Sequence, residues 1–180
     1  VASIVENMLS FARKSDASFS THDPAVLMDK VLVLAETDYD LKNHNDFKSI
    51  ALEKRYEAHL PPVVCESGKI QQVILNILNN GAYAMFESEK DVAPKFVLRL
   101  NRETASNMLR IEIEDNGPGM DENTAKQIFD PFFTTKPVGA GTGLGLSVSY
   151  FIITETHNGS MDVVSEPGRG ATFIIRLPLD

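Results

Sequence analysis

The sequence predicts an α+β fold, a two-layer sandwich in which helices cover one face of a mixed, mostly antiparallel sheet. Two stretches, residues 24–35 and 67–85, repeat apolar residues at helical spacing. Two others, residues 95–115 and 160–177, alternate apolar and polar residues on both sides of a turn, as antiparallel hairpins do. One-sided helices and one-sided strands bury their apolar faces against each other, which gives this fold class.

The order of elements follows from their boundary residues. Asp23-Pro24 begins a helix, since proline is tolerated in a first turn, and Ser67 is a plausible N-cap. In the first half of the chain we expect a helix from residue 24 that fades near 43–46, a strand at 47–59 ended by Pro61-Pro62, and a helix at 67–88. In the second half we expect a hairpin of 95–102 with 108–115, a helix at 147–156, and a hairpin of 160–165 with 172–177.

Residues 1–14 place apolar side chains on one face of a potential helix that is too short to be stable alone in water. We expect it either to belong to a separate helical bundle or to fold back onto its own domain. The polar residues 17–23 read as a linker, so the main domain is residues 24–180. A chain that starts at Val1 without Met suggests a fragment of a longer protein.

The composition narrows the function classes. The net charge of −8 and the pI near 5.0 make nucleic acid an unexpected partner. No apolar run approaches the roughly 20 residues that cross a bilayer, and no signal peptide is visible. We therefore expect no membrane contact by this fragment and a cytoplasmic location, either in a soluble protein or as the cytoplasmic part of a membrane-bound protein. Cys65 is the only cysteine, which excludes an internal disulfide; we expect it at a turn.

A glycine-rich stretch is the first candidate site. Glycines alternate at positions 139, 141, 143 and 145, just before the helix expected at 147–156. Such a loop can adopt backbone angles closed to other residues. Its N–H groups, beside a helix N-terminus, suit a polyphosphate. Taken alone, the pattern also fits a mobile surface loop.

Asp115 is the second candidate. It ends an alternating strand and precedes an Asn-Gly-Pro-Gly turn, which holds its carboxylate rigidly. An ionised carboxylate only accepts hydrogen bonds. It would therefore pair with the amino group of adenine and reject the carbonyl that guanine carries there. The alternative is an Asx-type turn cap.

The helix at 67–88 carries the third candidate. Gln72, Asn76 and Asn80 form one stripe, a turn apart each time. Asn is about 0.5–0.7 kcal/mol worse than Ala in a helix, so the cluster of Asn76, Asn79 and Asn80 does not serve helix stability. Solvated asparagines are one interpretation. The other is that Asn80 offers a carbonyl oxygen to Mg²⁺, which prefers such hard ligands.

Four stretches together identify a family. The Asn-rich helix, DNGPGM at 115–120, FDPFFTTK at 129–136 and GTGLGL at 141–146 follow the order of the four ATP-binding boxes of sensor histidine kinases. From about residue 24 to residue 180 the chain resembles the catalytic ATP-binding domain of that family, within the wider group of gyrase, the Hsp90 chaperone and the mismatch-repair ATPases. By this resemblance residues 1–16 would end the second helix of a dimerisation hairpin.

The resemblance also implies a set of site residues. Asn80 would bind Mg²⁺, Asp115 would bind the adenine of ATP, and the segment from Phe129 to Lys136 would belong to a lid that is mobile without nucleotide. The remaining implied nucleotide-binding residues are Gly117 and Gly119 as walls of the adenine pocket, Gly141, Thr142, Gly143, Leu144, Gly145 and Leu146 along the phosphates, and Thr172 as a hydroxyl beneath the adenine.

Two positions depart from the family pattern. Many relatives carry a basic residue where this chain has Ala140, and many carry Lys or Arg where it has Tyr83. Each departure removes a positively charged side chain that would stabilise the phosphates. Lys136 is the nearest remaining cation, so we place it in the catalytic set with Asn76 and Asn80, and keep Tyr83 in the nucleotide pocket.

The implied function is a protein-histidine kinase of a two-component system. Its domain would transfer the γ-phosphoryl group of Mg·ATP to a histidine on its own upstream hairpin, for relay to the receiver domain of a response regulator, and the full-length protein would be a homodimer. The chain's own histidines lack the surroundings of the family's acceptor. They are His22, which we expect at a helix entry, and His44, His59 and His157.

Three other functions remain open. Hydrolytic members of the wider group keep a Glu where this chain has Asn76, and an amide cannot act as a base. A non-catalytic nucleotide-binding scaffold is favoured slightly by Ala140 and Tyr83. A serine kinase acting on an anti-sigma antagonist would share the ATP-binding fold, but usually lacks a hairpin helix like residues 1–14.

Overall fold

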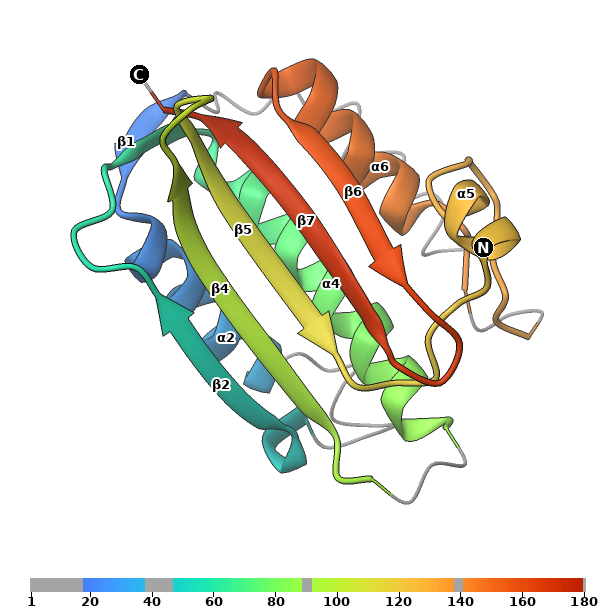
Figure 1. The fold of residues 1–180 in the computed structure, drawn as a ribbon. Coiled ribbons are helices and arrows are strands. Elements are labelled where there is room, and N and C mark those ends of the chain that lie inside the picture. Colours follow the sequence, from blue (N-terminus) through green and yellow to red (C-terminus); the bar gives the residue numbers. More distant parts are fainter. Residues whose placement is uncertain (1–17, 38–46, 89–91, 138–140, 180) are drawn as a thin grey trace.

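The computed structural model describes residues 18–37, 47–88, 92–137 and 141–179. Its main feature is a five-stranded sheet in the order β2-β4-β5-β7-β6 (Figure 1). Every neighbouring pair is antiparallel except β2 with β4, which is parallel. The mixed, mostly antiparallel sheet is therefore confirmed. Its strands are β2 (Ala51–Tyr56), β4 (Lys95–Glu103), β5 (Met108–Asp115), β6 (Ser160–Ser165) and β7 (Ala171–Pro178).

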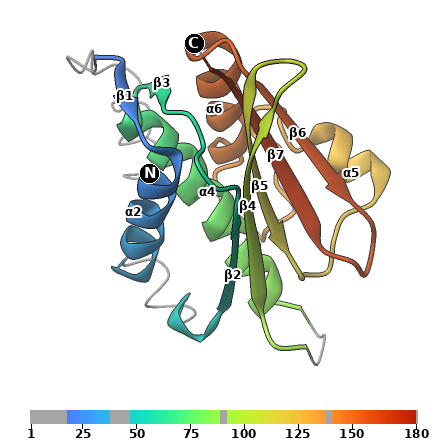
Figure 2. The same ribbon diagram turned by 60° about the vertical axis from the view of Figure 1, so that its left-hand side comes forward.

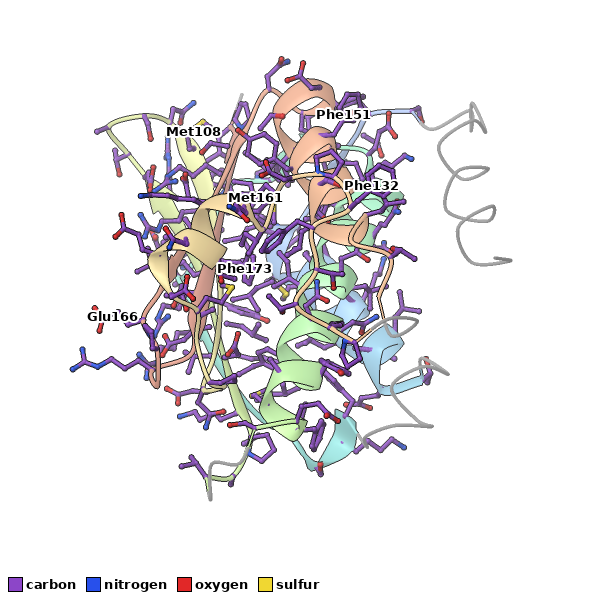
Figure 3. All side chains as sticks on the ribbon, turned by 90° about the vertical axis from the view of Figure 1, so that its right-hand side faces the viewer. Met108, Phe132, Phe151, Met161, Glu166 and Phe173 are labelled. Carbon is purple, nitrogen blue, oxygen red and sulfur yellow. The ribbon has the colours of Figure 1, made fainter. Side chains whose placement is uncertain are left out.

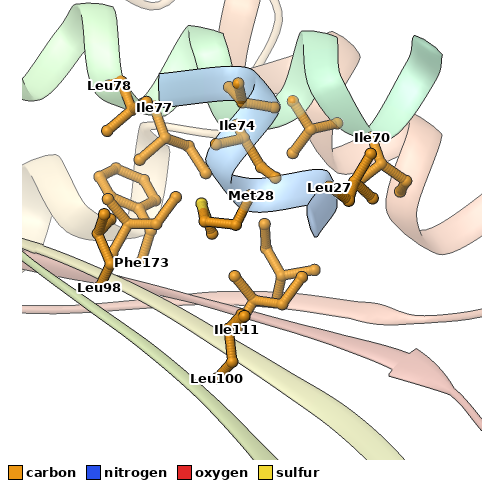
Figure 4. Close-up of a cluster of buried hydrophobic side chains, with 14 of the residues drawn as sticks. Leu27, Met28, Ile70, Ile74, Ile77, Leu78, Leu98, Leu100, Ile111 and Phe173 are labelled. Carbon is orange, nitrogen blue, oxygen red and sulfur yellow. The ribbon is translucent and has the colours of Figure 1, made fainter. Parts of the chain in front are cut away.

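Helices α2 (Pro24–Thr37), α4 (Ser67–Phe86) and α6 (Gly145–Phe151) lie on one face of the sheet (Figure 2). The hydrophobic core fills the space between the two layers. Met28 of α2 lies among buried side chains of α4 and of the sheet (Figure 4). Because side chains alternate along a strand, one set of each strand faces the helices. That set includes Leu98 and Leu100 of β4, Ile111 and Ile113 of β5, and Phe173 and Ile175 of β7.

The other face of the sheet carries charged side chains in register. Arg99 of β4 contacts Glu112 and Glu114 of β5, at 3.3 Å and 2.6 Å between nitrogen and oxygen. Arg110 bridges Glu112 to Glu103 at 2.6 Å and 3.0 Å. Such partly exposed pairs each stabilise a fold little. Their charge explains why helices cover one face of this sheet only.

The segment expected as a linker ends in a strand. Strand β1 (Ser20–His22) pairs antiparallel with β3 (Val63–Cys65), a three-residue strand that the sequence analysis missed because so short a run has no detectable period. His22 is thus a strand residue. Asp23, directly before α2, caps the helix, since its Oδ1 accepts the N–H groups of Ala25 and Val26 at 2.8 Å and 3.2 Å.

Other expected boundaries also need correction. Cys65 lies buried in β3, not at a turn, and burial raises the pKa of its thiol to about 11. The stretch expected as one strand begins with a 3₁₀ turn, Phe47–Ser49, before β2 starts. Ser67 is the first residue of α4 and does not cap it. The N-cap is Glu66, whose N–H donates to Nε2 of His157 at 3.1 Å.

Two helical features lie outside the expected elements. A short helix, α5 (Glu122–Gln127), follows β5, and the Asp121 side chain accepts the Thr124 N–H at its start. Helix α6 begins at Gly145, two residues before the expected start, and continues as a π-helical turn, Ile152–Thr156. The expected bundle helix at 1–16 lies outside the described residues. No helix that the structure describes is both long and apolar enough to span a membrane.

Candidate nucleotide-binding site

A cavity of about 670 Å³ lies where α4, the end of β5 and the start of α6 meet. Ligand pockets are typically about 300–1,000 Å³. The four stretches singled out in the sequence, far apart along the chain, all contribute to its lining. Of the predicted site residues, those that line it are Asn76, Asn80, Tyr83, Asp115, Gly119, Lys136, Gly141, Thr142, Gly143, Leu144, Gly145 and Leu146. The main part of the predicted site is thus brought together.

Asp115 lies at the floor of the cavity, 6% exposed, as the last residue of β5. Its Oδ1 accepts the N–H of Gly117 at 2.9 Å. The Asx-type turn and the position in the pocket, posed as alternatives, therefore coexist. Gly117 does not line the cavity; it orients the carboxylate that does.

The turn between β6 and β7 packs tightly against this floor. Gly170 has a φ of +82°, and a Cβ added to it would clash with the main-chain carbonyl of Asp115. Gly119, with a φ of +71°, lies equally close to the carbonyl of Glu166. Only glycine permits these contacts. The position of Asp115 thus depends on a turn more than fifty residues further along the chain.

Phe129 and Thr172, like Gly117, do not line the cavity. The register of β5 with β7 places Ala171 opposite Asp115 and Thr172 opposite Glu114. Because the strand alternates, Ala171 and Phe173 line the cavity, whereas Thr172 belongs to the other face; the role of its hydroxyl beneath the adenine stays a prediction. Phe129 packs against Tyr150, 5.1 Å between ring centroids, and its neighbour Ile128 lines the cavity instead.

Helix α4 is joined to the start of α6 through Asn76. Its Nδ2 donates to the carbonyl of Gly145 and to Oγ of Ser149, both at 3.1 Å. Ser149 is fully buried and donates its own hydrogen to the Gly145 carbonyl at 2.9 Å. The sequence analysis missed Ser149, since only helical spacing from Gly145 could have indicated it. The Asn76 amide is thereby fixed beside the glycine-rich segment.

The glycine-rich segment is shaped by a close backbone contact. Gly143 has a φ of +66°, and a Cβ there would clash with the main chain of Phe132. Phe132 donates its N–H to the Gly143 carbonyl at 2.9 Å and has a φ of +67° itself. Phe132 is 68% exposed and lies on the side of the molecule away from the sheet (Figure 3). Residues 138–140, including Gly139 and Ala140, lie outside the described residues.

Lys136 reaches across the cavity to α4. Its Nζ donates to Oδ1 of Asn80 at 3.0 Å and lies 4.3 Å from the centroid of the Tyr83 ring. Burial lowers the pKa of the Lys136 ammonium. Three residues chosen separately from the sequence therefore form one cluster.

The site suits a nucleotide with its metal. No group of three or more His, Cys, Asp or Glu side chains that could hold a metal occurs among the described residues. Mg²⁺, however, needs few protein ligands when phosphates and waters complete its shell. Oδ1 of Asn80 already contacts a cation. Oδ1 of Asn79, another residue of the cavity wall, is buried without a hydrogen-bond partner in the described part of the chain. The wall thus offers neutral oxygen acceptors.

Comparisons with known proteins agree with this geometry. The family model described as histidine kinase-, DNA gyrase B-, and HSP90-like ATPase matches residues 65–180. The chain is 35% identical over 178 residues to the signal transduction histidine-protein kinase AtoS of Escherichia coli (strain K12), covering 98% of this chain and 27% of AtoS. It is 36% identical over 185 residues to the sensor kinase CckA of Brucella abortus (strain 2308), covering 98% of this chain and 19% of CckA.

Solved structures share the fold. Full-length ShkA in complex with AMPPNP superposes with a TM-score of 0.76 at 24% identity, over 98% of this chain and 35% of that one. The histidine kinase ThkA in complex with the response regulator protein TrrA gives 0.75 at 23% identity, over 98% and 46%. The chain therefore belongs to the family of histidine kinase-, DNA gyrase B- and HSP90-like ATPases, as the ATP-binding catalytic domain of a sensor histidine kinase.

Asn80 should carry the Mg²⁺ dependence of nucleotide binding, and Asn79 should not. Asn80 shares the helix face of Asn76, whereas Asn79 lies about 100° around the helix. We expect Asn80→Ala to lower the affinity for Mg·AMPPNP at least about tenfold, with little change when EDTA removes the metal. Asn79→Ala is the matched control, measured by calorimetry in the same buffers. Loss of metal dependence in Asn79→Ala alone would show that the assigned ligand is wrong.

Proposed function

We propose that this chain transfers the γ-phosphoryl group of Mg·ATP to a histidine on an upstream dimerisation hairpin of its own protein, for relay to a response regulator. Residues 24–180 would be the catalytic domain, residues 17–23 the linker and residues 1–16 the end of the hairpin. The full-length protein would act as a homodimer, with this part in the cytoplasm. The main support for this proposal is that Asp115, Asn80, Lys136 and the glycine-rich segment line one cavity.

The division of roles follows from the chemistry of each group. Asp115 would accept the adenine amino group, and Asn80 would hold Mg²⁺, which when bound neutralises charge on the phosphates. Lys136 would supply positive charge to the phosphates, since its Nζ lies 3.0 Å from Oδ1 of Asn80. Phosphoryl transfer needs positioning and charge neutralisation more than covalent participation by the protein. A neutral imidazole offers a free nitrogen, so the nucleophile needs no base.

Asn76 separates transfer from hydrolysis. Activation of a water molecule needs a group that accepts its proton, and the Asn76 amide cannot do so. Its nitrogen is also committed to Gly145 and Ser149. This disfavours an ATP hydrolase and leaves the non-catalytic scaffold as the alternative. The relatives support the kinase, since AtoS is a histidine-protein kinase and ThkA forms a complex with a response regulator protein.

The chain alone should neither label itself nor release phosphate quickly, yet should label a separately supplied hairpin domain of its parent protein. In the sequence none of the four histidines has the neighbours of the family's acceptor, and His157, among the described residues, is buried with both ring nitrogens hydrogen-bonded. The assay is incubation with γ-labelled ATP, with and without the hairpin, comparing bound label and free phosphate.

The controls separate the candidate functions. A hairpin whose acceptor histidine is replaced by Gln should stay unlabelled, and the label on the intact hairpin should be acid-labile. Nucleotide binding without any label would favour the scaffold. Rapid phosphate release by the chain alone would point to a hydrolase, and label on a serine of a small partner protein would point to the anti-sigma type.

A further inference from the structure

Lys136 is bound by the site in an unusual way for a half-buried lysine. Its ammonium contacts a neutral carbonyl oxygen, Oδ1 of Asn80, and the face of the Tyr83 ring. Lys136 forms no ion pair in the part of the chain that the structure describes. Both partners attract cations without carrying charge. Asn80 and Tyr83 therefore form a cation site that the protein's own ammonium fills.

The stem of Lys136 lies beside the glycine-rich segment. A Cβ added to Gly141 would lie 3.2 Å from Cδ of Lys136. Any movement of the ammonium away from Asn80 therefore takes place directly beside the glycine-rich segment. Asn80 and Tyr83 are three residues apart on α4, so one face of the helix presents both groups.

We propose that Lys136 is the resident cation of the nucleotide-free site, that Tyr83 positions its ammonium on Asn80, and that Mg²⁺ arriving with nucleotide displaces it. This rests on the proposed function, because it takes Asn80 as the Mg²⁺ ligand. A divalent ion at Asn80 repels an ammonium twice as strongly as a monovalent ion at the same distance. The two cations therefore exclude each other, and the displaced ammonium becomes available to the phosphates.

The first test follows the Lys136 side chain by NMR in this chain without nucleotide. The ring current of Tyr83 should shift the Lys136 ε-methylene protons upfield, and Lys136→Met identifies the signal by its loss. Tyr83→Phe keeps an aromatic face and should keep the shift. Tyr83→Leu fills similar space without that face and should abolish it. A signal at the ordinary lysine position in the unmodified chain, or one that Tyr83→Leu leaves unchanged, would overturn the positioning role of Tyr83.

The second test measures competition with a bare metal ion, again without nucleotide. Mn²⁺ is the probe, since it broadens the side-chain amide signal of Asn80 when it binds there. Lys136→Met should lower the Mn²⁺ concentration needed for this broadening by about tenfold, the amount expected for loss of one hydrogen bond and one cation–π contact. Lys126→Met removes an equal charge from an exposed site on α5 and should change nothing. Equal effects of both variants would overturn the competition.

The third test adds Mg·AMPPNP to the unmodified chain. The Lys136 signal should move to the ordinary lysine position as the site fills, while the backbone signals of the sheet stay in place. A bound complex with an unmoved Lys136 signal would overturn the displacement. Failure to bind Mg·AMPPNP at all, measured by calorimetry, would overturn the proposed function and the displacement with it. The two failures are distinguishable, because the first occurs with nucleotide bound.

Discussion

Asp115→Asn should weaken ATP binding by about 5- to 150-fold and remove the preference for ATP over GTP. Asn keeps the oxygen that accepts the Gly117 N–H at 2.9 Å, so the turn after β5 should survive. Its amide nitrogen, however, can turn a donor toward the adenine amino group, which is itself a donor. A mismatched polar contact at a buried position costs about 1–3 kcal/mol, which gives that range of affinity. Asp115 is 6% exposed, so solvent cannot relieve the mismatch.

Calorimetric titration with ATP and GTP measures this effect, and Asp121→Asn is the matched control. Asp121 also accepts a backbone N–H, that of Thr124 at 2.8 Å, but it caps α5 and does not line the cavity. Asn is an equally good N-cap. The control removes the same unit of charge and should leave both affinities unchanged. If the unmodified chain bound ATP and GTP equally well, Asp115 would not be the adenine-selective group.

Gly170→Ala should lower the free energy of unfolding by about 3–4 kcal/mol and abolish nucleotide binding. An alanine at a φ of +82° is strained by about 1–2 kcal/mol. Its Cβ would in addition clash with the carbonyl of Asp115 at the end of β5, so that strand or the turn must shift. Either shift moves the carboxylate out of the cavity floor.

Gly168→Ala separates the backbone strain from the clash with Asp115, because it introduces the strain alone. Gly168 has a φ of +83°, but a Cβ there meets nothing within 4 Å. It should therefore cost only the 1–2 kcal/mol of backbone strain, and should keep nucleotide affinity. Denaturant unfolding and calorimetry on both variants give the comparison. Equal losses of stability in the two variants would show that the contact with Asp115 contributes nothing.

The fold class could be predicted from the sequence because it depends on local periodicity. Alternation marked the strands around 95–115 and 160–177, and a stripe of apolar residues marked α4. Boundaries without a period were predicted poorly. β3 is three residues long, and α6 changes to a π-helical turn within one continuous apolar run. The N-cap of α4 is Glu66, whose N–H donates to the distant His157, a contact that no local pattern encodes.

The cavity residues could be predicted where they belong to the four sequence motifs. Most of the predicted residues line one cavity, because motifs that bind the same ligand must lie close together in the fold. Thr172 was predicted from the family motif without regard to the strand's alternation, and it does not line the cavity. Counting back from Phe173, whose side chain must face the core, would have selected Ala171. Phe129 was predicted in the nucleotide pocket from its motif, whereas its ring packs against Tyr150 and the hydrophobic core.

The sequence by itself determined the layers of the fold and the chemistry available to the site, because side-chain direction repeats with the period of a strand or a helix. Only the tertiary structure decided which of those groups touch. The contact between Lys136 and Asn80 joins residues 56 positions apart, and that between Asn76 and Ser149 joins residues 73 apart. Such contacts depend on how whole elements pack against one another, and the register of β5 with β7 sets the floor beneath them.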